Sequence, residues 1–283
     1  MREWAVDITV SPRYRKLGLI GQGARSSILL VVDEQDGRQY ALKRVPKKTS
    51  DDQRFIEQTE TEYEVSRGFT HPVLRKSYSL RRIRRWLKLV EVQLLMEYFP
   101  GRNLEELVSS TSLPQLVAIF GKVAEGLQSL HQLGWVHADI KPNNILVCPE
   151  TQDVRIIDFG QSCRIGTVKD RIQGTPDYIA PEQVRRQPLD QRTDIFNLGA
   201  TMYWVLTGKP WPTLLPGNQM RPGQKLLHSN GTSWLYKPPH ELNPKVPVVL
   251  SLLVMDCLKD RPQDRPTDMR QVTSRLQISH SKG

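Results

Sequence analysis

Two short segments near the middle of the chain carry residues suited to phosphate chemistry. The first, at 137–144, reads His-Ala-Asp-Ile-Lys-Pro-Asn-Asn and contains Asp139, Lys141 and Asn144. The second reads Asp-Phe-Gly and begins at Asp158, fourteen residues after Asn144. Asp158 and Asn144 offer hard oxygen ligands of the kind that Mg²⁺ accepts. Asp139 can take the proton of an incoming hydroxyl, and Lys141 can reach a transferring phosphate. Because phosphoryl transfer depends mainly on positioning and charge neutralisation, it is the first hypothesis.

The order and spacing of these residues resemble the catalytic loop and the metal-binding segment of protein kinases. An Asp-Phe-Gly tripeptide alone is common in turns, so the resemblance depends on further motifs in the family's order. Such motifs occur between residues 14 and 275, and each lies on an element that would position it.

A turn with two glycines lies near the N-terminus, before an apolar run at 28–32. It reads as a hairpin between two strands, whereas a dinucleotide-binding fingerprint would need a helix after its glycines. Glycine lets a backbone approach phosphate closely, because it has no Cβ. Ser26 replaces the family's third glycine, which leaves open how close the loop comes to phosphate. The resemblance implies nucleotide contacts from Ile20, Gly21, Gln22, Gly23, Ala24, Arg25, Ser26, Ser27 and Ile28.

A strand-like alternation puts Ala41 and Lys43 on one face. An inward-facing lysine needs an anionic partner, because an unpaired buried charge is costly. The helix predicted at 55–68 offers four glutamates that composition does not distinguish: Glu57, Glu60, Glu62 and Glu64. The resemblance selects Glu62, since the family's glutamate precedes a His-Pro pair by nine residues, as Glu62 precedes the pair at 71–72. It implies that Lys43, held by Glu62, positions the α- and β-phosphates of ATP and that Ala41 also contacts the nucleotide.

An apolar run that begins at 94 stops at a Pro-Gly breaker and predicts a buried strand. The resemblance makes it the last strand of an N-terminal lobe, followed by the hinge. Met96 would guard the back pocket, and the backbone from Glu97 to Phe99 would hydrogen-bond adenine. Apolar residues then recur at helical spacing over 116–133 and lead to the catalytic loop.

Beyond Asp158, a polar segment leads to Gly-Thr-Pro-Asp-Tyr at 174–178 and then to Ala-Pro-Glu. In protein kinases, Ala-Pro-Glu closes the activation segment and its glutamate pairs with a distant arginine, which the resemblance matches to Glu182 and Arg265. If such a pair is buried, breaking it from one side costs roughly 3–5 kcal/mol. Asp194 opens an apolar helix, where we expect it to cap amide groups. The resemblance implies that Asp194 also steadies the catalytic-loop backbone.

Two details of the resemblance concern the acceptor and its regulation. Lys141 and the segment around Thr175 favour a serine or threonine acceptor over tyrosine. Ala138 stands where most members of the family have an arginine that can pair with a phosphorylated activation loop. We therefore expect activation to depend less on loop phosphorylation, and Thr167 not to be an essential switch.

Length and composition are compatible with one large domain or two small ones. The chain has 283 residues, of which 38% are hydrophobic, enough for an ordinary core. Its three cysteines form no Cys-x-x-Cys pair, which indicates neither a disulfide framework nor a zinc site and fits a reducing cytoplasm. The first ten residues do not resemble a signal peptide, and the longest weakly polar run, at 196–208, is too short to span a bilayer.

The net charge of +10 is concentrated in part at 75–88, where seven basic residues occur without an acid. They are Arg75, Lys76, Arg81, Arg82, Arg84, Arg85 and Lys88. One interpretation is a nucleic-acid or anionic-surface site. The favoured interpretation is a solvated strand pair whose edge is kept from aggregating by its charge. The Pro-rich stretch at 208–247 predicts a long loop with at most a short helix at 224–229.

These observations together predict an α+β, two-lobed protein-kinase fold of bacterial type. An N-lobe at about 14–99 would hold an antiparallel β-sheet and one helix, and a mainly helical C-lobe would follow at about 100–275, with ATP in the cleft and short extensions at 1–13 and 276–283. The expected activity is transfer of the ATP γ-phosphoryl group to a protein serine or threonine, with Mg²⁺ or Mn²⁺. A pseudokinase scaffold is the main alternative, but it would be expected to lack Lys43, Asp139 or Asp158. A small-molecule phosphotransferase would generally lack the Ala-Pro-Glu segment.

Overall fold

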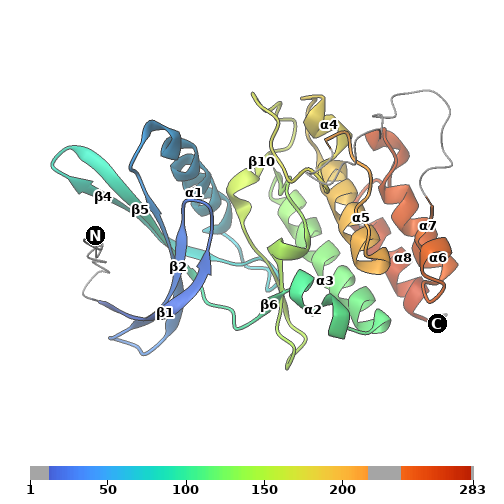
Figure 1. Cartoon of the computed structure of the whole chain (residues 1–283), viewed down its shortest axis with the longest axis horizontal. Coiled ribbons are helices and arrows are strands. Elements are labelled where there is room, and N and C mark those ends of the chain that lie inside the picture. Colours follow the sequence, from blue (N-terminus) through green and yellow to red (C-terminus); the bar gives the residue numbers. More distant parts are fainter. Residues whose placement is uncertain (1–12, 216–236, 282–283) are drawn as a thin grey trace, which may run out of the picture. The chain divides into compact units, whose positions relative to one another are not determined.

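The structure, a computed structural model of the 283-residue chain, describes residues 13–215 and 237–281. The chain forms two compact units. Unit 1 comprises Met1–Phe69 and Arg75–Pro100, and unit 2 comprises Thr70–Leu74 and Gly101–Gly283. In Figure 1 the strands of unit 1 run from blue to teal, and the helices of unit 2 run from green to red.

Unit 1 is built on a five-stranded antiparallel sheet with the order β1-β2-β3-β5-β4. The strands are β1 (Tyr14–Gln22), β2 (Ser27–Asp33), β3 (Gln39–Pro46), β4 (Ser77–Arg85) and β5 (Lys88–Glu97). Apolar residues on the inner strands alternate between the two faces, so that Leu29 and Leu42 pack on one face while Ala41 and Met96 pack on the other. The outermost strands of this sheet are β1 and β4.

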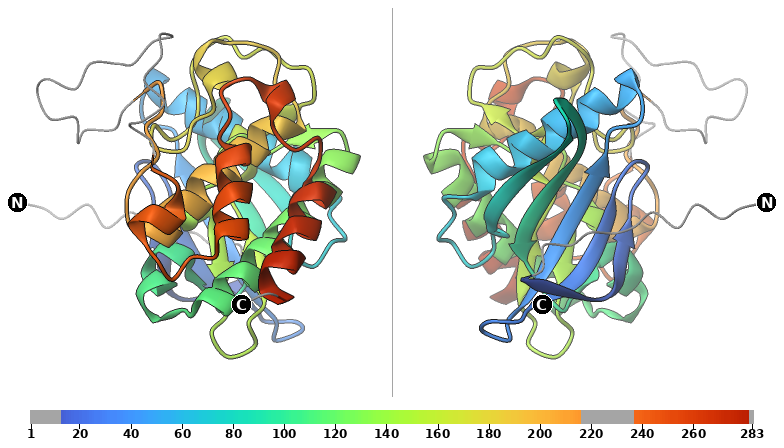
Figure 2. Two further views of the ribbon diagram at one scale, coloured as in Figure 1. Left: turned by 90° about the vertical axis from the view of Figure 1, so that its right-hand side faces the viewer. Right: turned by 90° about the vertical axis from the view of Figure 1, so that its left-hand side faces the viewer.

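One helix, α1 (Gln53–Ser66), packs against unit 1's sheet (Figure 2). Its buried Ile56 contacts Val45 of β3 and Val92 of β5. The chain enters the helix through a 3₁₀ turn, in which the Asp52 carboxylate accepts the amides of Lys48 and Thr49, each at 2.8 Å. These contacts fix where α1 begins and therefore which of its glutamates face the sheet.

Unit 2 is mainly helical. Its helices within the described residues are α2 (Leu104–Leu107), α3 (Leu113–Gln132), α4 (Pro181–Val184), α5 (Gln191–Thr207), α6 (Pro239–Leu242), α7 (Val248–Cys257) and α8 (Met269–Ser281). Leu116, Phe120, Val123 and Leu127 of α3 are buried at the helical spacing that the sequence predicts. Helix α3 packs against α8, and α5 packs against α7.

Short strands in unit 2 hold the two segments that could do chemistry. Strands β6 (Arg102–Asn103), β8 (Ile145–Val147) and β9 (Val154–Ile156) form one small sheet, and β7 (Trp135–Val136) pairs with β10 (Cys163–Arg164). The catalytic loop lies between β7 and β8, and the Asp-Phe-Gly segment lies between β9 and β10. Each segment is therefore held at both ends by a strand.

The predicted fold class is confirmed, since unit 1 is an antiparallel sheet with one helix and unit 2 is mainly helical. The Pro-rich stretch needs a correction, because it forms the helical turn α6 rather than a continuous loop up to residue 247. The short helix expected at 224–229 lies outside the described residues. Among the helices of residues 13–215 and 237–281, none is both long enough and apolar enough to cross a membrane.

Candidate active site

The Asp139 carboxylate lies at the centre of a hydrogen-bond network in unit 2. Its Oδ1 accepts the backbone amide of Thr175 at 2.9 Å and the Thr175 hydroxyl at 2.8 Å. Its Oδ2 accepts Lys141 Nζ at 2.9 Å, and the same amine donates to Thr175 Oγ1 at 2.7 Å. The three side chains therefore form a closed triangle. It brings together three residues that the sequence placed on two separate motifs.

Asn144 is oriented mainly by the backbone carbonyl of Asp139. It ends the 3₁₀ turn Pro142–Asn144, and its Nδ2 donates to the Asp139 carbonyl at 2.9 Å and to Asp139 Oδ2 at 3.4 Å. Within the described part of the chain, no group donates to Asn144 Oδ1. That oxygen is therefore available as a hard ligand for a cation.

Asp158 is held beside this turn by its two chain neighbours. Ile157 donates its amide to the Asn144 carbonyl at 3.0 Å, and its carbonyl accepts His137 Nε2 at 3.1 Å. Phe159 lies against the His137 ring, with centroids 5.1 Å apart. Asp158 itself has φ 65° and ψ 69°, a left-handed conformation that non-glycine residues seldom adopt. Such strained backbone clusters at functional sites.

A divalent cation would find two oxygen donors here, from Asn144 and Asp158. No cluster of three or more His, Cys, Asp or Glu side chains suited to a metal occurs among the residues the structure describes. A cation would therefore complete its shell with water and with phosphate oxygens of a ligand, as Mg²⁺ does in nucleotide sites. The donor set fits such a metal.

A buried Asp194 anchors the backbone of the catalytic loop. Its Oδ2 accepts the amide of His137 and its Oδ1 accepts the amide of Ala138, each at 2.8 Å, while His131 Nε2 lies 2.8 Å from Oδ2. Burial raises the pKa of Asp194, but the hydrogen bond from His131 and the charges of both histidines outweigh it and hold the pKa below 3.8. This carboxylate therefore stays ionised while it fixes the loop.

The prediction that Asp194 caps α5 is wrong. Asp190 is the N-cap residue, and its carboxylate accepts the amide of Arg192 at 2.8 Å. Asp194 lies in the first turn of the helix. Its oxygens bind the buried amides of the catalytic loop rather than helix amides, because the loop amides have no water to bond to. Its predicted contact with the catalytic-loop backbone is observed.

Ala138 fills a small apolar space in the catalytic loop. Its side chain packs with Val136, Cys163 and Leu189, and it is 1% exposed. Its φ of 62° lies in the left-handed region, and its carbonyl accepts Gln183 Nε2 at 2.8 Å. The same Gln183 amide donates to the Gln173 carbonyl at 3.1 Å, so that at Ala138 an uncharged side chain links the activation segment to the catalytic loop.

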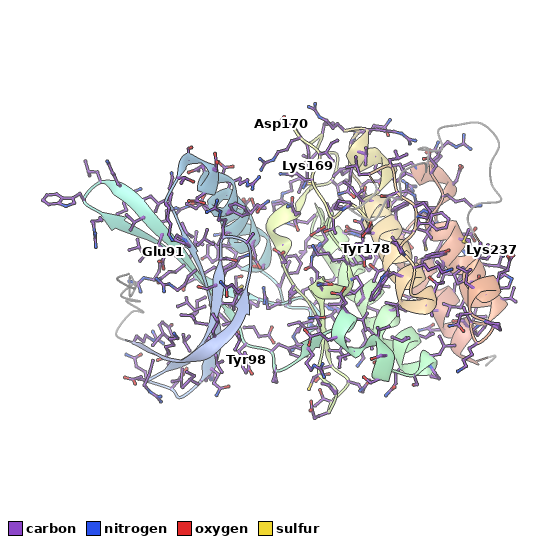
Figure 3. All side chains as sticks on the ribbon, in the orientation of Figure 1. Glu91, Tyr98, Lys169, Asp170, Tyr178 and Lys237 are labelled. Atoms are coloured by element: carbon purple, nitrogen blue, oxygen red, sulfur yellow. The ribbon has the colours of Figure 1, made fainter. Side chains whose placement is uncertain are left out.

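The first part of the activation segment is held by its own contacts. The Thr167 carbonyl accepts the amide of Leu189 at 3.0 Å, and the Lys169 ammonium donates to the Gln161 carbonyl next to the Asp-Phe-Gly turn. Lys169 is labelled in Figure 3. Burial lowers the pKa of Lys169, and the nearby Cys163 thiol and Asp139 carboxylate oppose that shift only in part. Thr167 is brought near neither Asp139 nor Lys141 by any of its hydrogen bonds.

The predicted pair of Glu182 and Arg265 is present and buried. The two side chains form a bidentate ion pair with distances of 2.8 and 2.9 Å, and they are 2% and 0% exposed. The guanidinium also donates to three carbonyls, those of Arg192 at 2.8 Å, Lys259 at 2.8 Å and Asp260 at 2.9 Å. All five N–H groups of the guanidinium are therefore used.

In unit 1, Lys43 Nζ lies 2.6 Å from Glu62 Oε2, and Glu62 is 1% exposed. Of the other candidate glutamates, Glu60 pairs with Arg82 at 2.7 Å. Sequence reasoning missed Arg75, whose Nη2 donates to Glu62 Oε1 at 3.1 Å. Each carboxylate oxygen of Glu62 is therefore paired with a basic side chain. The position of Arg75 inside a long basic stretch of the sequence does not reveal this pairing.

The nucleotide-contact residues predicted in unit 1 lie in a turn, on one face of the sheet, and at or just beyond the end of β5. Residues 20–28 form the end of β1, a tight turn in which Gly23 donates its amide to the Ser26 carbonyl at 2.8 Å, and the start of β2. Ala41 and Met96 pack together with Leu94 on one face of the sheet. Glu97 closes β5, and its amide donates to the Lys76 carbonyl at 2.9 Å. Phe99 follows two residues later.

Gln183 and Thr201 also contact the catalytic loop, although sequence reasoning did not find them. Gln183 bonds Ala138, and Thr201 Oγ1 lies 3.3 Å from the Ile140 carbonyl. Gln183 directly follows Glu182, and Thr201 lies about two helical turns after Asp194. Their side chains are nevertheless common polar types that do not stand out in a sequence. Only the packing of α4 and α5 against the loop identifies them.

Comparison with known proteins gives a consistent result. The family model described as "Protein kinase domain" matches residues 14–277. A probable serine/threonine-protein kinase PknB of Corynebacterium glutamicum is 31% identical over 71% of this chain and 32% of its own length. The serine/threonine-protein kinase PknA of Mycobacterium tuberculosis is 31% identical over 72% of this chain and 49% of its own length. The chain thus spans less than half the length of these relatives. The crystal structure of the M. tuberculosis PknI kinase domain superposes with a TM-score of 0.70 at 20% identity, covering 95% of this chain and 96% of that one, which supports the fold.

Proposed function

The chain belongs to the protein kinase family, and on this premise we propose that it transfers the γ-phosphoryl group of ATP to serine or threonine hydroxyls of proteins. The observation that carries the proposal is the closed triangle of Asp139, Lys141 and Thr175. In it a carboxylate binds a hydroxyl with an ammonium beside it, which is the arrangement that an acceptor hydroxyl and a transferring phosphoryl group need.

Asp139 is the base in this proposal. Its carboxylate accepts three hydrogen bonds from Thr175 and Lys141 and is 6% exposed. An acceptor hydroxyl that replaces one of these donors would be aligned by the carboxylate and would pass its proton to it as the new P–O bond forms. Lys141 is then free to neutralise charge on the transferring phosphoryl group.

Asn144 and Asp158 would hold Mg²⁺, or Mn²⁺ in its place. The metal, when bound with ATP, supplies positive charge that offsets the charge on the phosphate oxygens. Asn144 is prepared for this role because its Nδ2 is committed to Asp139, which fixes the amide plane. We further propose that Lys43, fixed by Glu62, binds the phosphates of ATP, and that residues 20–28, Ala41, Met96, Glu97 and Phe99 contact the nucleotide.

The serine/threonine preference rests on the contact between Lys141 and Thr175, at 2.7 Å. It places an ammonium beside the carboxylate that would receive the acceptor hydroxyl, at the two positions where the sequence resembles serine/threonine kinases. The two relatives described above bear names of serine/threonine kinases, which agrees with this preference. A pseudokinase scaffold is not favoured, since Lys43, Asp139 and Asp158 are all present and the network around Asp139 is complete.

Label transfer from γ-labelled ATP with Mg²⁺ to a generic basic protein tests the activity. We expect label on serine and threonine, and a loss of about 10²–10⁴-fold in rate for Asp139→Asn, the range that a general base contributes. Asp170→Asn is the matched control, because Asp170 is an exposed carboxylate elsewhere in the activation segment. The proposal is wrong if wild-type protein transfers no label, or if Asp139→Asn and Asp170→Asn behave alike.

A further inference from the structure

The β4–β5 hairpin ends in two exposed apolar residues. Trp86 is 95% exposed and Leu87 is 91% exposed, more than any other large hydrophobic residue within the described ranges. They form a two-residue turn, because Arg85 of β4 pairs with Lys88 of β5. Figure 1 shows this hairpin, in teal, projecting from the sheet of unit 1, and its strand β4 is an edge strand of that sheet. We call residues 84–88 the hairpin tip.

Trp86 makes no contact with the described residues that would stabilise the fold. Its φ is 57°, in the left-handed region, where glycine or asparagine is preferred at such turns and a bulky side chain is an outlier. Its indole makes no ring contact or hydrogen bond with any described residue. A strained residue that packs against nothing indicates a role outside the fold itself.

The basic side chains of the hairpin tip likewise make no stabilising ion pair within the described part of the chain. Arg84, Arg85 and Lys88 form no ion pair with a residue in the described part of the chain. Two acids on neighbouring elements, Glu60 of α1 and Glu91 of β5, already have other partners, Arg82 and Arg44. Arg85 and Lys88 also stand directly opposite each other, an arrangement of like charges that destabilises a hairpin.

The order of these groups along the hairpin matches the layers of a membrane surface. The apolar pair is at the extreme end and the cations follow immediately behind it. Tryptophan favours the boundary between headgroups and acyl chains, and basic residues within a Debye length of an anionic leaflet are attracted to it. We propose that the hairpin tip docks on an anionic lipid bilayer, with Trp86 and Leu87 inserted at that boundary and Arg84, Arg85 and Lys88 on the lipid phosphates.

A nucleic acid fits the tip less well. Single strands are bound in positively charged grooves lined by several aromatic faces on which successive bases stack. The hairpin tip is a two-residue turn that offers one indole, and Leu87 has no π-face for stacking. A bilayer uses both apolar residues, because it rewards buried apolar area rather than stacking. This inference does not depend on the proposed kinase activity.

Co-sedimentation of the full chain with lipid vesicles, with and without phosphatidylserine, tests the proposal. We expect binding to the anionic vesicles that weakens as salt is raised, and little binding to neutral ones. The double variant Trp86→Gly/Leu87→Ser should bind about tenfold or more weakly, through the loss of inserted apolar area. Its melting temperature should stay level or rise, because glycine suits the left-handed turn position. A residue that served the fold would instead lower the melting temperature.

Three further variants separate the effect of the tip's charges from the effects of net charge and of general surface hydrophobicity. Arg84→Glu/Arg85→Glu should abolish the salt-dependent binding, whereas Lys245→Glu/Lys259→Glu, the same change of charge at exposed lysines of unit 2, should not. Leu252→Ser removes an exposed apolar side chain of α7 and should leave binding unchanged.

The proposal is overturned if wild-type protein does not bind phosphatidylserine vesicles at low salt, or if the hairpin variants bind as wild type does. It is also overturned if single-stranded DNA or RNA binds tightly and loses affinity in Arg84→Glu/Arg85→Glu while vesicles do not bind. That result would make the tip a nucleic-acid contact.

Discussion

The two threonines of the activation segment differ in what their side chains contact. Thr175 Oγ1 bonds both Asp139 and Lys141, whereas Thr167 bonds neither. A hydrogen bond to a charged group contributes roughly 1.5–3 kcal/mol, so Thr175→Ala should lower kcat by about tenfold to a hundredfold. Thr167→Ala should stay within about tenfold of wild type, a difference of roughly 1.4 kcal/mol. Steady-state kinetics with ATP and a protein acceptor measure both.

Thr175→Ser is the control for this prediction, because it restores the hydroxyl and should recover most of the activity. A loss in Thr167→Ala as large as that in Thr175→Ala, with ATP affinity intact, would show that the loop is switched by Thr167. It would also show that Ala138 does not have the regulatory meaning we give it.

Asp194 should make stability depend on pH in acid. Its folded-state pKa lies below the ordinary 3.8, so the ionised form stabilises the fold above that pH. The contribution is lost as the pH falls from about 3.8 through the lower folded-state value. Asp194→Asn is expected to be less stable than wild type at neutral pH, and the gap in unfolding free energy should narrow in acid. Urea denaturation over a pH series measures this, and a gap that is constant with pH would contradict it.

At single positions, the sequence predicts which motif residues come together but not all the partners they have. Asp139, Lys141 and Asn144 follow from a contiguous motif, so local spacing is enough to bring them together. Arg75 is different. In the sequence it is one of seven similar cations, yet it is 7% exposed and bound to Glu62, while Arg84 and Arg85 remain in solvent. Only the register of the sheet against α1 separates them.

Among the helices, the close approach of α5 and α7 depends on Gly199. A Cβ at this position would lie 2.6 Å from the Cβ of Cys257 and 3.3 Å from Leu258 Cγ. Rotamer changes cannot relieve a Cβ to Cβ clash, so Gly199→Ala should cost roughly 1–3 kcal/mol of stability through displacement of the helices. Thermal and urea unfolding measure the loss.

Gly121→Ala on α3 is the matched control. Nothing lies within 4 Å of a Cβ at Gly121, so the same substitution should stabilise the helix by about 0.5–1 kcal/mol. If both variants shift stability in the same direction and by similar amounts, the packing argument for α5 and α7 fails.

Elements are predicted well where the pattern is local. The helix expected at 55–68 is α1 (Gln53–Ser66), and the strand pair inferred from the basic stretch is β4 with β5. Prediction fails where tertiary contacts decide between similar residues. Asp190 and Asp194 both lie near the start of α5. The amides that donate to Asp194 belong to a loop 56 and 57 residues earlier in the chain. No local rule identifies which acid caps the helix.

Across the whole molecule, all three cysteines are buried and lie in unit 2. Burial raises the pKa of the Cys257 thiol to about 12 and also raises that of Cys163. Because the thiolate is the reactive form, a chromogenic disulfide reagent at neutral pH should react slowly or not at all with native protein and with all three thiols after unfolding. Thiol reactivity in urea should therefore report the unfolding of unit 2. Rapid reaction of one thiol per chain in native protein would contradict this.

During synthesis on the ribosome, the Glu182–Arg265 ion pair can form only some seconds after Glu182 has been added to the chain. Arg265 is added 83 residues after Glu182, a delay of roughly 4–17 s at rates of about 5–20 residues per second. Until then the carboxylate has no guanidinium beside it, and burying it alone is costly. The nascent chain must therefore keep the end of its activation segment hydrated until the residues around Arg265 have been made. The catalytic loop and the activation segment are therefore synthesised well before the contact that fixes the end of the activation segment can form.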